Sequence, residues 1–242
     1  MKTGRIPLAQ LLREGLDGLA VPDAGRVAGI LETYLAELSR WNARFGFVKA
    51  DEEELVVKHV LDSLSAWRAV QELAGPGSAR APDSSAPEDR LPAGRVLDVG
   101  TGAGFPGIPL AIALPEISFT LLERASRKIA FLKTCRIILG LPNIRAEQAD
   151  LAAVEGRFDV VTFRAFAPLE RFLEEAGPSL SFGALVAYKG RHSRGREEAQ
   201  GVEALANGRW QAEVREVTVP FLQEERCLVV VRPRPTGSST GA

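Results

Sequence analysis

The chain has few cysteines and no long apolar run. Cys135 and Cys227 are the only cysteines among 242 residues, which excludes a disulfide framework and offers no spacing typical of a metal knuckle. We therefore expect no metal site. The apolar residues of the first twenty positions are interrupted by charged residues and by Pro7, so this stretch contains neither a secretory core nor a membrane span. The sequence predicts a cytoplasmic protein with no membrane partner.

A strong charge of one sign is also missing. The 30 Lys and Arg residues balance 31 Asp and Glu residues, giving a formal net charge of −1. This balance provides no global attraction to nucleic acid, so any RNA contact must come from a local patch. Apolar residues make up 45% of the chain and charged residues 25%, which is typical of a globular protein. The length suits one α/β domain with a helical extension.

The first part of the chain carries helical apolar spacing. One amphipathic helix is predicted over residues 23–41, and a second helical region opens at Asp51, with Glu54 three residues later in a capping-box pattern. Residues 75–94 are then dominated by Gly, Pro, Ser and Ala, a composition typical of a flexible linker. The predicted organisation is an N-terminal helical extension (1–74), a linker (75–94) and a larger domain (95–242).

Short apolar runs alternate with helical patterns after the linker. This alternation predicts an α/β fold, with a doubly wound, mainly parallel, Rossmann-like sheet covered by helices on both faces. The runs 212–219 and 227–231 are expected to close the sheet as an antiparallel pair. The expected strands are 96–99, 119–122, 144–146, 160–163 and 184–188, and the expected helices are 108–114, 126–139 and 169–176.

A glycine-rich loop directly follows the first predicted strand. Gly100, Gly102 and Gly104 alternate there, which lets the backbone turn sharply and approach a ligand where a Cβ would clash. A nucleoside-like cofactor at the carboxyl end of this strand is the natural inference. The alternative is that the glycines only form a tight turn between a strand and a helix.

The surroundings of the loop favour S-adenosylmethionine over a dinucleotide. The spacing Gly102-x-Gly104-x-x-Gly107 formally matches the dinucleotide fingerprint, but Pro106 and Pro109 remove backbone N–H donors that a pyrophosphate would need. The strand carries a carboxylate, Asp98, just before the loop, and this suits the ammonium and sulfonium groups of S-adenosylmethionine.

Other strand ends contribute further candidates. Glu123 ends the second run, where a carboxylate can accept hydrogen bonds from both ribose hydroxyls; alternatively, it caps the helix that begins near Ser126. Ala146 and Glu147 end the third run, and Arg164 ends the fourth. All are expected to converge on the crevice at the carboxyl edge of the sheet, the usual ligand position in such folds.

With these motifs in view, the sequence resembles the glucose-inhibited division protein B family. The glycine loop indicates only a class I methyltransferase, whereas the block Val57-Lys-His-Val-Leu-Asp-Ser-Leu64 on a preceding helix makes the resemblance specific. Further matches are Trp41-Asn42, Lys128–Leu132, Arg145–Glu147, Phe163–Leu169 and Lys189-Gly190. The resemblance implies methyl transfer to N7 of a guanine in small-subunit (16S) ribosomal RNA, with the RNA or the small ribosomal subunit as partner.

The resemblance also implies roles for individual residues. The implied cofactor contacts are Gly100, Phe105, Ala146, Glu147 and Arg164, to which the loop and strand ends add Asp98, Gly102, Gly104 and Glu123. On the N-terminal helices, Asn42, Lys58, His59 and Asp62 are expected to form the RNA-side wall of the cleft. The second asparagine that family members commonly carry after Trp-Asn is replaced here by Gly46-Phe47-Val48, so its role does not transfer.

A basic segment follows the last parallel strand. Lys189, Arg191, Arg194 and Arg196 are candidates for phosphate contacts, although a solvated surface loop is an open alternative because Glu197 and Glu198 follow at once. No catalytic base is assigned, because guanine N7 has an in-plane lone pair and needs no proton removed before attack. Two other functions stay open: a nicotinamide-dependent oxidoreductase and a non-catalytic RNA-binding or assembly module. A monomer is expected.

Overall fold

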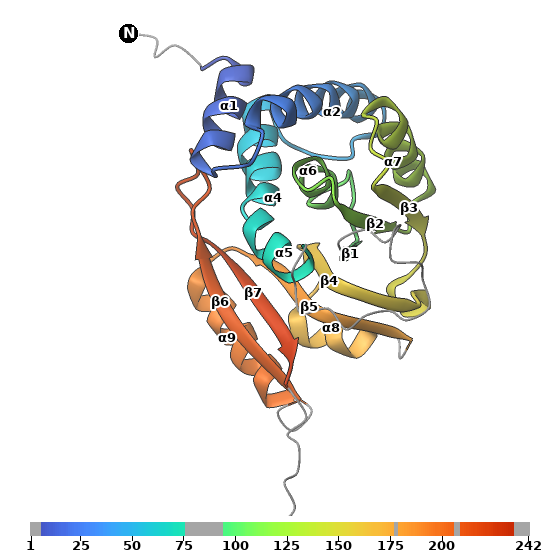
Figure 1. Ribbon diagram of the computed structural model, residues 1–242, viewed down its shortest axis with the longest axis vertical. Helices are drawn as coiled ribbons and strands as arrows, with labels where there is room; N and C mark the ends of the chain where they lie inside the picture. The colour runs from blue at the N-terminus through green and yellow to red at the C-terminus, as the bar shows by residue number, and fades with distance from the viewer. Residues whose placement is uncertain (1–5, 76–93, 177–178, 206–208, 235–242) are drawn as a thin grey trace, which may run out of the picture.

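The computed structural model describes residues 6–75, 94–176, 179–205 and 209–234. Its centre is a seven-stranded sheet in the order β3-β2-β1-β4-β5-β7-β6 (Figure 1). Strands β1 to β5 are parallel to one another, and β7 pairs antiparallel with both β5 and β6. The strands are β1 (Gly94–Val99), β2 (Ile117–Glu123), β3 (Ile144–Gln148), β4 (Gly156–Arg164), β5 (Leu180–Lys189), β6 (Trp210–Val217) and β7 (Arg226–Pro233). The predicted doubly wound fold and its closing antiparallel pair are confirmed.

Helices cover both faces of this sheet. Successive strand residues belong to two different apolar clusters: Val96 and Val160 face one cluster, whereas Leu97 and Val161 face the other. The first cluster packs under the N-terminal helices, α6 (Gly107–Ala113) and α7 (Ser126–Ile138), and the second under α8 (Leu169–Glu175) and α9 (His192–Ala204). A strand buried on both faces reads as a continuous apolar run, which is why these strands were visible in the sequence.

The N-terminal helices pack directly on the sheet domain and share its first apolar cluster. Tyr34 is fully buried, and its hydroxyl donates a 2.6 Å hydrogen bond to the Ala103 carbonyl oxygen in the glycine loop. The predicted capping box at Asp51 and Glu54 is present. The elements are α1 (Leu8–Gly18), α2 (Ala24–Phe45), α3 (Glu52–Glu54), a π-helix η1 (Leu55–Leu61), α4 (Asp62–Leu64) and α5 (Trp67–Ala74). Residues 76–93 of the predicted linker lie outside the described residues.

Two helices were not predicted. In α1, the buried Leu11, Leu12 and Leu16 have helical spacing, but the helix is short and precedes a turn at residues 19–22. In α9, the basic segment forms a helix rather than a loop, and only Gly195, Ala199 and Val202 of this helix are buried, so its apolar stripe is too small to be read from sequence.

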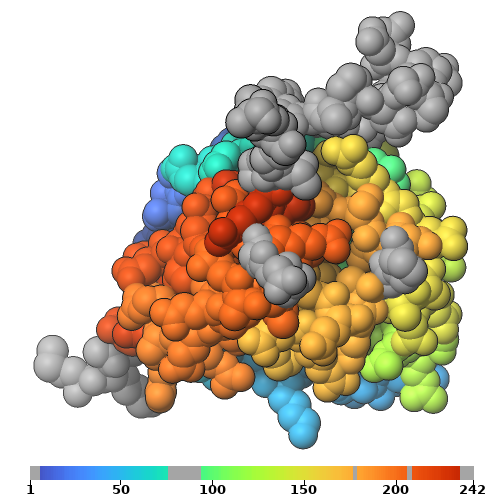
Figure 2. Space-filling view, turned by 90° about the horizontal axis from the view of Figure 1, so that it is seen from below, coloured from blue at the N-terminus to red at the C-terminus, as the bar shows by residue number. Residues whose placement is uncertain are grey.

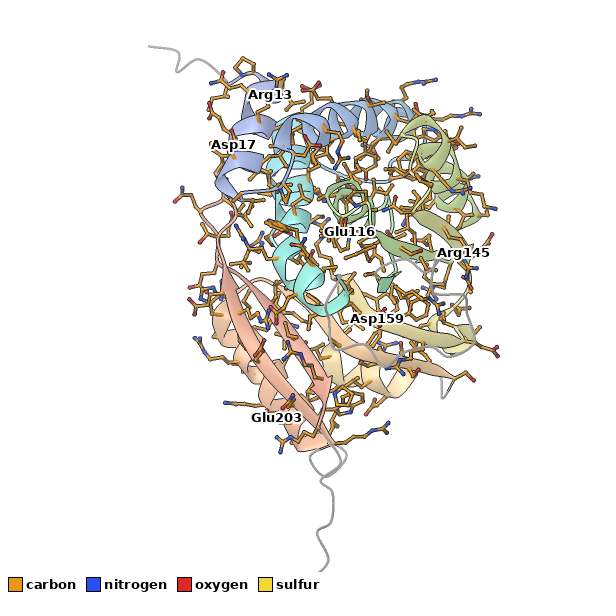
Figure 3. All side chains as sticks on the ribbon, viewed as in Figure 1. Arg13, Asp17, Glu116, Arg145, Asp159 and Glu203 are labelled. Carbon is orange, nitrogen blue, oxygen red and sulfur yellow. The ribbon has the colours of Figure 1, made fainter. Side chains whose placement is uncertain are left out.

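Polar side chains attach the outer parts of the fold to the sheet. Glu203, labelled in Figure 3, accepts a 3.2 Å hydrogen bond from the backbone N–H of Ala212 and so fastens α9 to β6. Asp159, also labelled, accepts a 2.8 Å bond from the backbone N–H of Arg95 and ties β4 to β1. Seen from below, the surface is formed largely by the C-terminal strands and α9, in orange to red, beside yellow residues of the middle of the chain (Figure 2).

Candidate active site

The glycine loop after β1 has a backbone that only glycine adopts without strain. Gly100, Gly102 and Gly104 have φ values of +66°, +61° and +100°. A Cβ at Gly100 would lie 2.5 Å from Cδ2 of Phe166, and one at Gly104 would lie 2.5 Å from Cδ1 of Ile108. At Gly102, by contrast, the nearest atoms would be 3.9 Å away or more. Gly100 and Gly104 are thus needed for close packing, while Gly102 borders open space.

Asp98 lies beneath the loop, fully buried. Its Oδ2 accepts a 2.8 Å hydrogen bond from the backbone N–H of Gly107 at the start of α6, and its Oδ1 has no hydrogen-bond partner among the described residues. Burial raises the pKa of this carboxyl to about 7. Asp98 therefore holds the loop to the following helix, and direct contact with a cofactor stays a prediction.

A cavity of about 770 Å³, the glycine-loop cavity, opens at the carboxyl ends of β1, β2 and β3. Its walls combine apolar side chains such as Val99, Leu122 and Leu151 with the carboxylates of Glu123 and Asp150. Gly100 and Phe166 also line it, as do the cations Arg124 and Lys128. A cavity of this size with a few polar groups on apolar walls is typical of a small-molecule or cofactor site.

Glu123 joins the loop to the start of α7. Its Oε1 accepts 2.9 Å hydrogen bonds from the backbone N–H groups of Arg124 and Ala125, and its Oε2 accepts a 3.1 Å bond from Gly102 N–H. Lys128 Nζ lies 3.7 Å from the same Oε2. Glu123 is not the N-cap of α7, because that position is Ala125; its carboxylate accepts from the two backbone N–H groups that precede the helix. The ribose-binding role remains a prediction for a side chain that also lines the cavity.

A second cavity of about 700 Å³, the basic cavity, adjoins the first and shares Phe166 and Ala167 with it. Asp62 is buried in its wall, where its two oxygens each lie 3.1 Å from an arginine, Arg164 from β4 and Arg226 from β7. Its lining further includes Lys58, His59, Tyr188, Lys189 and Arg194. The carboxyl ends of β4 and β5 and the π-helix η1 bring this set together.

Arg164 and His59 form a fixed pair in the basic cavity. Arg164 Nη2 lies 2.7 Å from His59 Nδ1, and Arg164 Nη1 donates a 2.8 Å bond to the Lys58 carbonyl oxygen. Because a guanidinium can only donate, Nδ1 is the acceptor and the imidazole proton sits on Nε2. Burial and the charge of Arg164 lower the pKa of His59 to about 4, so the ring is neutral at pH 7.

Several predicted residues lie outside both cavity walls. Phe105 is buried against Tyr34 and lies beneath the Arg164 guanidinium. Ala146 and Glu147 lie within β3, ahead of the cavity-lining residues 149–152, and Glu147 is ion-paired with Arg145, labelled at the sheet edge in Figure 3. Gly102 and Gly104 belong to the loop and Asp98 to the end of β1, but none of the three lines the cavity wall.

Asn42 and Lys58, two of the predicted RNA contacts, are held by partners on or near the N-terminal helices. The Asn42 side chain exchanges two 2.8 Å hydrogen bonds with the backbone of Val48, which fixes the turn after α2. Lys58 Nζ lies 3.1 Å from Glu54 and 3.7 Å from Glu224. Lys58, unlike Asn42, still lines the basic cavity.

The basic segment is largely ion-paired. Lys189 Nζ lies 2.6 Å from Glu198, and the Arg194 and Arg196 side chains lie 3.5 Å and 3.7 Å from Glu198 and Glu216. Arg191 is exposed and has no ion pair within the described part of the chain. Of these four residues, Lys189 and Arg194 line the basic cavity. The segment is not a loop, because Arg194 and Arg196 lie within α9 and Arg191 directly precedes it; the choice between phosphate contacts and a solvated surface stays open.

Comparison with known proteins decides the family. The family described as rRNA small subunit methyltransferase G matches residues 82–229. The chain belongs to this family. A ribosomal RNA small subunit methyltransferase G from Cupriavidus necator is 38% identical, with the similarity covering 92% of this chain and 94% of that one. Those of Cupriavidus pinatubonensis and Ralstonia nicotianae are 39% identical (88% and 88% covered) and 37% identical (92% and 94% covered). The resemblance inferred from the sequence motifs is confirmed.

Sequence reasoning missed Phe166, Arg226 and the residues 149–152. Phe166 and Ala149 each follow a strand end by one or two residues, whereas the sequence-based candidates ended at Glu147 and Arg164, short of these wall residues. Arg226 starts a strand that runs antiparallel, which brings its amino end to the same edge as the carboxyl ends of the others. No group of three or more potential ligands for a metal ion occurs among the described residues, and no helix described is long and apolar enough to cross a membrane.

Proposed function

We propose that this protein transfers the methyl group of S-adenosylmethionine to N7 of a guanine in small-subunit ribosomal RNA. The observation that carries the proposal is the pair of adjoining cavities at one sheet edge: one rests on the glycine loop, and the other is lined by cations. Methyl transfer needs a donor and an acceptor in line at van der Waals distance, and two cavities with a common border provide that arrangement. Membership of the family supports the same reaction.

The glycine-loop cavity has the groups that S-adenosylmethionine requires. When bound, this cofactor supplies an electrophilic methyl group on a cationic sulfur. Gly102 borders open space that a Cβ would enter, so the backbone can lie close to the ligand. The carboxylates of Glu123 and Asp150 suit ribose hydroxyls or a cationic amino group, and Val99, Leu122 and Leu151 suit an adenine ring. We assign this cavity to the cofactor.

The same geometry opposes a dinucleotide. The backbone N–H of Gly107, at the start of α6, is already used by the Asp98 carboxylate. Pro109 has no N–H to offer, and Pro106 has none either. A pyrophosphate would therefore meet a carboxylate where it needs donors. A nicotinamide-dependent oxidoreductase would therefore lack donors for its dinucleotide cofactor at this loop.

The basic cavity is assigned to the target base. Its cations, Arg164, Lys189 and Arg226, can hold the negatively charged backbone around an unstacked nucleotide. His59 is neutral and carries its proton on Nε2, so it can donate a hydrogen bond and cannot act as a strong base. Since N7 attacks with its own lone pair, these residues need only bind and orient the base.

The reaction also defines the partner. We propose that the acceptor is 16S ribosomal RNA, free or within the small ribosomal subunit, and that the enzyme acts on it as a cytoplasmic monomer. The lining of the basic cavity has more cations than carboxylates, and this excess supplies local attraction on a chain with a net charge of −1. The cations are Lys58, Arg164, Lys189, Arg194 and Arg226, and the carboxylates are Asp62 and Glu198.

The proposal is tested with purified protein, methyl-tritiated S-adenosylmethionine and either naked small-subunit RNA or small subunits from a strain that lacks this protein. We expect label in the RNA and a rise in melting temperature with S-adenosylmethionine but not with NAD or NADP. RNA binding without label transfer would support the non-catalytic module instead. A thermal shift with NAD alone would support the oxidoreductase.

A further inference from the structure

Phe166 lines both cavities at their border. It is the second residue after β4, and its side chain contributes to the walls of the glycine-loop cavity and of the basic cavity. The preceding Ala165 has φ +53°, a left-handed conformation that costs a non-glycine residue energy. The chain thus leaves the strand through an unfavourable turn that brings Phe166 to the border.

One edge of the Phe166 ring is held in place. Its Cδ2 lies so close to the loop that a Cβ on Gly100 would come within 2.5 Å of it, and its ring centroid lies 6.0 Å from that of the buried Phe163. The side chain is nevertheless only half-buried. A ring that is supported from behind and still open toward two cavities can accept a flat ligand on its free surface.

The target base has the shape that such a ring selects. A guanine that has left its stack loses its π contacts with neighbouring bases, and an aromatic side chain restores them. Stacking also fixes the plane of the base, and the N7 lone pair lies in that plane. A base stacked on Phe166 would therefore hold its N7 lone pair in a plane parallel to the ring, at the border of the two cavities.

We propose that Phe166 is a substrate-positioning residue whose ring stacks on the target guanine and aligns N7 with the methyl group. This inference rests on the proposed function. It goes beyond it by naming the surface that orients the base, which neither the glycine loop nor the cations of the basic cavity supplies.

The test compares Phe166→Leu, which removes the π surface, with Phe166→Tyr, which keeps it. Phe182→Leu is the matched control, because Phe182 is also half-buried and belongs to the same run of aromatic contacts but lines neither cavity. For each variant, S-adenosylmethionine affinity is measured by calorimetry, and kcat and KM for methyl transfer to unmethylated small subunits are measured separately.

We expect Phe166→Leu to lower kcat/KM for the RNA roughly 5- to 150-fold, which corresponds to about 1–3 kcal/mol of base stacking. Its cofactor affinity should stay within threefold of wild type, and Phe166→Tyr should restore most of the activity. Phe182→Leu should leave kcat/KM unchanged. Two results overturn the inference: a Phe166→Leu enzyme with wild-type kcat/KM, or one whose reduced activity is explained by weak cofactor binding. Absence of transfer by the wild-type enzyme would instead refute the proposed function.

Discussion

Gly102 provides a sharp test of where the cofactor binds, because Gly140 is a natural control for it. Both glycines have φ +61°, and neither has a heavy atom closer than 3.9 Å to the position of an added Cβ. Gly140 follows the C-terminus of α7, away from both cavities. Replacing either residue by alanine imposes the same backbone strain, about 1–2 kcal/mol. In a chain of this size that strain lowers the melting temperature by about 2–8 °C.

The two variants should differ in cofactor binding. At Gly102 the added methyl group would enter the space bordered by Lys128, whose Nζ would be 4.0 Å away and which lines the glycine-loop cavity. If S-adenosylmethionine occupies that space, the added methyl group overpacks it at a cost of about 1–3 kcal/mol, or roughly 5- to 150-fold in affinity. We expect Gly102→Ala to lose that much affinity for S-adenosylmethionine in calorimetry, while Gly140→Ala keeps wild-type affinity. Equal affinities in two folded variants with similar melting temperatures would refute the placement of the cofactor.

Three further predictions follow from individual residues. Glu123→Ala should weaken S-adenosylmethionine binding by roughly ten- to a hundredfold in calorimetry, because a charge-assisted hydrogen-bond acceptor contributes about 1.5–3 kcal/mol. Binding within twofold of wild type would show that Glu123 serves only to hold the loop through its hydrogen bonds. Burial raises the pKa of Asp98 to about 7, so the contribution of this carboxyl to stability is complete below pH 4 and is lost as the pH rises through 7. Asp98→Asn should therefore flatten the decline of melting temperature between pH 5 and 8 relative to wild type. Parallel curves for the two proteins would contradict this. Replacing Arg191, Arg194 and Arg196 together by Ala should weaken RNA binding and leave cofactor affinity unchanged. The slope of log RNA affinity against log salt concentration should fall by about 0.7–0.9 for each phosphate that the variant no longer binds. Identical salt dependence in variant and wild type would show that RNA binds elsewhere on the protein.

The central fold could be predicted because its signals are local. Strands such as 96–99 are buried on both faces and therefore appear in the sequence as apolar runs. The alternating glycines of the loop predict a sharp turn, because their positive φ values would strain other residues. Helix α9 gave no such signal, since it is mostly polar and contains Gly195 and Gly201. Tertiary contacts with β6 and β7, such as the bond from Ala212 to Glu203, stabilise it instead.

Individual residues of the candidate site could be predicted from the sequence, but the contacts between them could not. The sequence placed Glu123 and Arg164 at strand ends, and both line a cavity there. It could not show that Arg164 binds Asp62 and His59 from a helix about a hundred residues earlier, because such pairing depends on how η1 docks on the sheet. For the same reason Arg164, expected at the cofactor, lines the basic cavity rather than the glycine-loop cavity. Phe166 lies within the family-matching segment Phe163–Leu169, but that match assigned it no role, and its place at the border of two cavities depends on the tertiary structure.

Methylation of guanine N7 in small-subunit ribosomal RNA by this protein can be measured directly in cells. Small-subunit RNA from a strain lacking the gene, and from the same strain complemented with wild type or with Gly102→Ala, is mapped for 7-methylguanine by mass spectrometry of nuclease fragments. We expect one fragment that carries the modification in the strain complemented with wild type and lacks it in the deletion strain, with a lower methylated fraction in the Gly102→Ala strain. An identical set of 7-methylguanine fragments in all three strains, with the wild-type protein expressed, would contradict it.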